Sequence, residues 1–170
     1  MRINSIEKQK DKNMKKLILL VLSATLFSAS LFATDWSHQE WDSDFNGRFS
    51  VAVTIGEGEF PYLNPVLAVR TSADHGLDIL IANVAHGSNL LKLSILIRFD
   101  DKEVKSYRAS CSNNGDTWFL EVDEETKLKI IAELKACGRI RVRLGSSVGD
   151  SDYSFNLNGS TSAINKLNLE

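Results

Sequence analysis

The chain has 170 residues, of which 43% are hydrophobic and 25% charged, with 20 Lys+Arg against 22 Asp+Glu and a formal net charge of −2. This composition excludes a collagen-like chain and a wholly disordered one, and the length suits a single domain. The charge balance gives no reason to expect nucleic acid as a partner, because affinity for phosphates comes mostly from lysine and arginine.

The first 33 residues have the layout of a secretory signal peptide. Two lysines precede the apolar run Leu17–Leu22, which continues as far as Phe27, and the small residues Ser28–Ser30 follow it. We expect cleavage after Ala33, or after Ser30 as second choice, and residues 14–33, beginning at Met14, are the expected leader proper. A retained membrane anchor is the alternative, but the apolar stretch falls short of the roughly 20 residues that span a bilayer. The sequence therefore predicts a periplasmic or secreted protein with no stable membrane insertion.

Removal of this leader would leave residues 34–170 as one domain with 14 basic and 20 acidic side chains, a net charge of −6. Both cysteines of the chain, Cys111 and Cys137, belong to this domain. An even number of cysteines in an oxidising compartment predicts one disulfide, which would stabilise the fold by about 3.5 kcal/mol in the chain-entropy model. A redox or metal pair is the alternative, but the C-x-x-C spacing is absent.

Short β-rich runs alternate with turn residues through this domain. An acidic segment, Thr34–Asn46, comes first, and its Trp36 and Trp41 are expected to pin it onto the fold. The expected strands are Phe49–Ile55, Leu67–Thr71, Leu77–Val84, Leu91–Phe99, Val104–Ala109, Thr117–Val122, Arg139–Leu144 and Tyr153–Leu157. Alternation places Phe49, Val51, Val53 and Ile55 on one face of the first strand.

One segment departs from the β pattern. Acidic residues precede a stripe that includes Leu128, Ile131 and Leu134, and a glycine follows Cys137, which predicts an amphipathic helix over about 124–137. Apolar residues near the C-terminus indicate a further short helix. The fold class is therefore expected to be mostly β, an antiparallel β-sandwich of about seven strands with one internal helix and a short C-terminal helix.

The sequence offers little catalytic chemistry. The histidines His38, His75 and His86 lack the spacing of metal ligands, so no metal and no cofactor are expected. Ser147 matches a G-x-S-x-G pattern, but a strand rather than a helix is expected after it and no histidine follows. A small envelope hydrolase or metalloenzyme that uses the histidines remains the alternative.

One local charge feature stands out in the acidic domain. Arg139, Arg141 and Arg143 face outward from one expected strand, and Arg98 and Arg108 from neighbouring strands could extend them into a basic face. Such a face could hold carboxylates or phosphates through bidentate hydrogen bonds. Trp118 is an additional candidate binding residue, since either Trp118 or its neighbour Phe119 must be partly exposed. The alternative for the arginines is an ordinary solvated face paired with Asp and Glu.

The order of features in the second half of the chain carries a family resemblance. The segments are Pro65–Arg70, Ile97–Asp100, Thr117–Phe119, the expected helix, Arg139–Arg143, Phe155–Gly159 and Ala163–Leu167. Over about residues 65–167 the chain resembles the exported type VI secretion accessory family (TagO/VasI-like) and, more loosely, the invasion-associated locus B group. Thr71 stands where the first family commonly has a cysteine.

This resemblance implies a non-enzymatic periplasmic accessory protein with a link to secretion, one that binds another envelope protein or a cell-wall component. It supplies no catalytic residues. An inhibitor or immunity protein against a periplasmic lytic enzyme would have the same physical character and differ only in its partner.

Overall fold

The computed structural model describes residues 35–43, 47–59, 61–73, 76–84, 92–112, 115–146, 149–167 and 169. Asp35–Glu170 forms one compact unit. The expected leader, residues 1–33, lies outside the described residues, as do His75, His86 and Ser147. None of the helices in the described segments combines the length and apolar character that a bilayer crossing requires.

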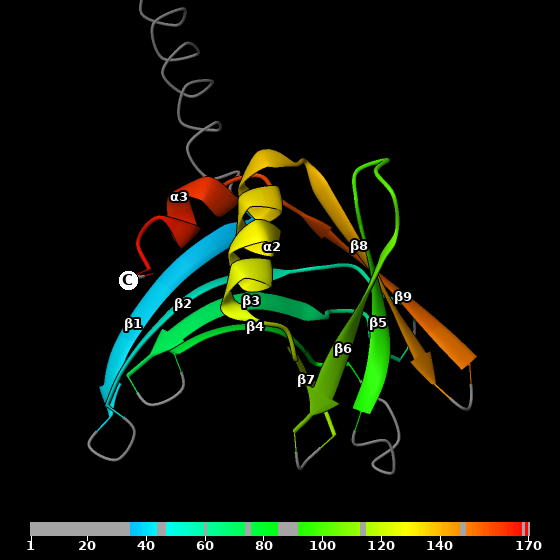
Figure 1. Cartoon of the computed structure of the whole chain (residues 1–170), viewed down its shortest axis with the longest axis horizontal. Coiled ribbons are helices and arrows are strands. Elements are labelled where there is room, and N and C mark those ends of the chain that lie inside the picture. Colours follow the sequence, from blue (N-terminus) through cyan, green and yellow to red (C-terminus); the bar gives the residue numbers. More distant parts are fainter. Residues whose placement is uncertain are drawn as a thin grey trace, which may run out of the picture. The chain divides into compact units, whose positions relative to one another are not determined.

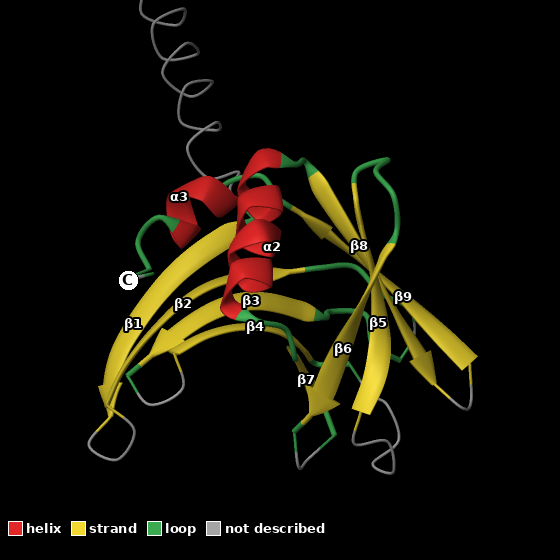
Figure 2. Ribbon diagram, in the orientation of Figure 1, coloured by secondary structure: helices red, strands yellow, loops and turns green. Residues whose placement is uncertain are grey.

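The domain is mostly β, as the sequence predicts (Figure 2). Its strands are β1 (Trp36–Ser43), β2 (Gly47–Ile55), β3 (Val66–Ser72), β4 (Gly76–Ala82), β5 (Lys92–Phe99), β6 (Lys105–Cys111), β7 (Thr117–Leu120), β8 (Arg139–Ser146) and β9 (Gly149–Asn156). They form one antiparallel sheet in the order β1-β2-β3-β4-β7-β6-β5-β8-β9. The expected count of about seven strands was therefore too low, and the two layers of the sandwich belong to one continuous sheet (Figure 1).

The strand missing from the prediction is β1, within the segment expected only as an acidic lead-in. It lies at the edge of the sheet and pairs with β2 alone among the strands. Polar side chains such as Gln39 and Glu40 are tolerated there, so β1 lacks a regular apolar alternation. Trp36 is buried, and its indole N–H donates to the carbonyl of Asn156 at 3.0 Å, which confirms that this tryptophan pins the segment to the fold.

The segment that follows β2 also pairs with β9, at the other end of the sheet. The Glu57 and Ser154 backbones exchange two hydrogen bonds of 2.8 and 2.9 Å, which attach the segment after β2 to the outer edge of β9. Gly56 and Gly58 allow this approach, because a Cβ on either residue would collide with β9 side chains. The segment Gly56–Glu59 is therefore held against β9.

The helices close the core beside this sheet. Helix α2 (Glu124–Ala136) begins at the cap Asp123, whose carboxylate accepts from the Thr126 N–H at 2.7 Å. It buries Ile130, Ile131 and Leu134, whereas Leu128, expected on the same stripe, is 44% exposed. Helix α3 (Ser160–Ile164) contacts α2, β1 and β2, and the Ser160 hydroxyl donates to the Leu134 carbonyl at 2.7 Å.

In β2 the residues Phe49, Val51, Val53 and Ile55 share a face, as alternation predicts, but this is the outer face. The core side carries the alternate residues, including Ala52 and Thr54, which are buried. Thr54 lies between Trp36 on β1 and Leu67 on β3, so its large neighbours fill the core at this position. Ile55, by contrast, is 64% exposed.

The structure does not contain the predicted disulfide, since Cys111 and Cys137 are both free. Cys111 is the last residue of β6. The Cys137 thiol lies at the C-terminal end of α2 and donates to Glu133, which also accepts from Lys102, a residue that precedes the start of β6. The two cysteines therefore lie near opposite ends of β6, which is roughly 20 Å long. A disulfide requires Cα atoms within about 7 Å of each other. The cysteine count therefore gives no support to an oxidising compartment.

Candidate functional site

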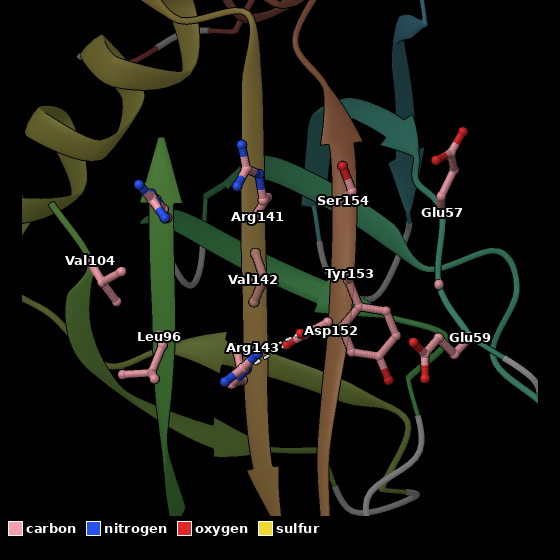
Figure 3. A pocket seen from close by; sticks show the side chains of 12 residues that line it. Glu57, Glu59, Leu96, Val104, Arg141, Val142, Arg143, Asp152, Tyr153 and Ser154 are labelled. Atoms are coloured by element: carbon pink, nitrogen blue, oxygen red, sulfur yellow. Dashed lines mark hydrogen bonds and ion pairs between the residues drawn. The ribbon is translucent and has the colours of Figure 1, made fainter. Parts of the chain in front are cut away.

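A groove of about 530 Å³ lies on the outer face of β5, β8 and β9, and we refer to it as the trough (Figure 3). Its charged lining consists of Arg98, Arg141, Arg143, Asp152, Glu57 and Glu59. The exposed aliphatic side chains of Leu96 and Val104 line it as well. The trough thus brings together three of the arginines that the sequence singles out.

Strand alternation explains why these side chains face outward. Val142 of β8 and Phe155 of β9 point into the core, so their neighbours Arg141 and Ser154 must point away from it. The strand register then aligns four residues in one row, each from a different segment of the chain. Arg98 lies opposite Arg141, Arg141 opposite Ser154, and Ser154 opposite Glu57.

Arg143 is neutralised within the protein. Its Nε and Nη2 atoms each donate to a carboxylate oxygen of Asp152 at 2.6 Å, a bidentate pair directly across β8 and β9 (Figure 3). The hydrogen bond from Arg143 lowers the pKa of Asp152 below its usual range, and the same bond raises the pKa of Arg143. Asp150 adds a second carboxylate at 3.9 Å. For this arginine the alternative of a solvated, cross-paired side chain is the correct one.

Arg98 and Arg141 are in a different situation. They lie directly opposite each other on β5 and β8, and like charges in this position destabilise a sheet. The Arg98 Nε donates to the Lys102 carbonyl at 3.1 Å, a neutral acceptor. Arg141 reaches Asp101 only at 3.4 Å, and that carboxylate side chain is 92% exposed. Within the described part of the chain, Arg98 has no ion-pair partner.

The opposite side of the trough is acidic. Glu57 and Glu59 are exposed and line it from the segment held against β9 (Figure 3). Neither glutamate takes part in an ion pair with another described residue. Their placement on the trough depends on the Glu57–Ser154 bridge.

Not all of the predicted site residues line the trough. Arg139 is exposed at the start of β8, two residues before Arg141, and is not part of the trough lining. Trp118 is completely buried in the core, so the prediction of Trp118 as a binding residue is wrong. Phe119, its neighbour on β7, is the partly exposed aromatic of the pair, and the Arg70 guanidinium lies 5.6 Å from the centre of its ring.

Of the three histidines, His38 is the one that the described residues include. Its Nε2 atom lies 2.9 Å from the Ser50 hydroxyl and 3.8 Å from a carboxylate oxygen of Glu40. A catalytic relay uses both ring nitrogens, one toward the nucleophile and one toward the acid, whereas both contacts here involve the same nitrogen. Ser50 is buried, and Glu40 is paired with Arg48 at 2.8 Å. The described residues contain no group of three or more side chains that could hold a metal ion.

Comparison with known proteins gives a likeness of fold. No family model matches the chain, and no curated protein matches its sequence. Among solved structures the chain is similar to invasion associated protein B from Bartonella henselae, with a TM-score of 0.52, 17% identity, and coverage of 78% of this chain and 91% of that one. This supports the looser part of the expected resemblance at the level of fold. The comparisons do not show the type VI secretion accessory family.

Proposed function

We propose that this protein is an exported, periplasmic, non-enzymatic binding or accessory protein that acts on an envelope protein or a cell-wall component. The leader-like N-terminal sequence supports export. The shared fold with an invasion-associated protein is compatible with an accessory or binding role. The trough is the proposed binding site.

The observation that carries this proposal is the juxtaposition of Arg98 and Arg141. These two adjacent arginines face a groove, and their partners among the described residues are one carbonyl and one exposed carboxylate at 3.4 Å, so their mutual repulsion is poorly compensated and lowers stability. A carboxylate or phosphate on a partner would relieve this repulsion, and arginine is suited to binding such groups. The exposed Leu96 and Val104 supply apolar contact beside it.

The test compares the partners that the protein retains from an envelope extract. The affinity-tagged full chain is used as wild type, as the double variant Arg98→Gln/Arg141→Gln, and as Arg143→Gln. The double variant should lose a partner that the wild type retains. Arg143→Gln is the matched control, because Asp152 already occupies Arg143, and it should retain more of the partner. A partner held equally by all three proteins would rule out the trough as the binding site.

A further inference from the structure

The charges of the trough are separated along one direction. The aligned row runs from Arg98 and Arg141 through Ser154 to Glu57. Neighbouring strands lie about 4.8 Å apart, so the row spans roughly 14 Å between its basic and acidic ends. The ion pair of Arg143 and Asp152 lies beside the row and cancels its own charge.

This separation restricts what can lie along the whole trough. A uniformly acidic ligand, such as a nucleic-acid strand, would meet Glu57 and Glu59 at the far end. A uniformly basic ligand would meet the two arginines. A ligand with a negative group at one end and a positive group at the other is complementary to both ends, and like-charge contacts exclude the alternatives.

An extended peptide matches the dimensions. An extended chain advances about 3.3 Å per residue, so about four residues cover the roughly 14 Å between the two ends. Glu57 is held in place for this role, since both its N–H and its carbonyl form hydrogen bonds with the backbone of Ser154.

We propose that the trough binds an extended peptide segment of a partner protein that carries one acidic side chain and, about four residues away, one basic side chain. The acidic side chain pairs with Arg98 and Arg141, and the basic side chain pairs with Glu57 and Glu59. This inference rests on the proposed function and adds the chemistry of the partner segment.

The experiment measures peptide affinity by fluorescence anisotropy with the purified protein. The probe is the N-terminally dansylated peptide Leu-Asp-Ser-Ala-Ser-Lys amide, compared with the same peptide carrying Asn for Asp, Gln for Lys, or both. The dipolar peptide should bind most tightly, and each neutral replacement should weaken binding by about 1.5- to fivefold, the range of a solvent-exposed ion pair.

The protein variants assign each charge to its end of the trough. Glu57→Gln/Glu59→Gln should weaken binding of the original peptide and leave binding of the peptide with Gln for Lys unchanged. Arg98→Gln/Arg141→Gln should weaken binding of the original peptide and leave binding of the peptide with Asn for Asp unchanged. Arg143→Gln should change the affinity for each of these peptides much less. A single cooperative thermal unfolding transition in each variant confirms that the variants are folded.

Two results would overturn the inference. One is that the protein binds the original peptide and the fully neutral peptide with equal affinity. The other is that Glu57→Gln/Glu59→Gln leaves the affinity for the original peptide unchanged. The proposed function would survive both if the envelope partner still depended on Arg98 and Arg141. It fails only if that partner is retained by the arginine double variant, so the two failures are distinguishable.

Discussion

The substitution Gly56→Ala tests how the acidic side of the trough is held. A Cβ on Gly56 would lie 2.5 Å from the carbonyl oxygen of Ser154 and closer still to the ring of Phe155. That carbonyl is part of the β9 backbone and accepts the Glu57 N–H, so it cannot move without disturbing the bridge. The segment after β2 must therefore shift away from β9.

The expected cost follows from these contacts. Overpacking a well-filled position costs about 1–3 kcal/mol. Weakening the two bridge hydrogen bonds costs about 0.5–1.5 kcal/mol for each. Since the two effects overlap, we expect the free energy of unfolding to fall by about 2–4 kcal/mol. For a domain of this size that corresponds to a drop in Tm of about 6–15 °C.

The assay is urea denaturation followed by tryptophan fluorescence, with a thermal melt beside it. Gly145→Ala in β8 is the matched control, because its Cβ would lie 3.6 Å from Asp150, an ordinary contact, and the change should stay within about 0.5 kcal/mol. Equal stability of the two variants would refute the account of how Gly56 and Glu57 are placed against β9.

Four further results are expected. Hydrogen bonds from the Gly138 and Arg139 N–H groups lower the pKa of Asp100, so its contribution to stability is present above about pH 4 and is lost as the pH falls through the lowered pKa. Urea denaturation from pH 6 to 3 should therefore show a shallower loss for Asp100→Asn than for wild type. Leu134→Ala should lower the free energy of unfolding by about 2–5 kcal/mol in the same assay, because this side chain is fully buried. Dithiothreitol should leave Tm unchanged, because both cysteines are free; a lowered Tm would contradict the structure. Intact mass spectrometry of the protein that cells accumulate should show a chain that begins at Thr34, and an unprocessed chain would contradict export by a cleaved leader.

The sequence predicted local features of the site and missed those that depend on distant pairing. Alternation correctly placed Arg141 and Arg143 on an outward face, because β8 is a regular strand with one side in the core. That Arg98 lies opposite Arg141 depends on the pairing of β5 with β8, which are far apart in the chain. The position of Glu57 depends on an isolated bridge to β9, for which no local pattern exists.

Other misses have equally specific causes. Alternation required Trp118 and Phe119 to face opposite sides but could not decide which side is the core. The larger Trp118 lies between Ile81 and Cys111 on the inner face of the sheet. The two cysteines were paired by their number alone, and a number carries no information about the distance between them.

The most direct test of the central claim is photo-crosslinking in living cells. A photoreactive p-benzoylphenylalanine replaces Leu96, which is 37% exposed within the trough, or Leu128, a similarly exposed leucine on α2 outside the trough lining. We expect a discrete crosslinked adduct from position 96 that Arg98→Gln/Arg141→Gln removes, and none from position 128. An adduct from position 128 with none from position 96 would contradict the assignment of the trough as the binding site.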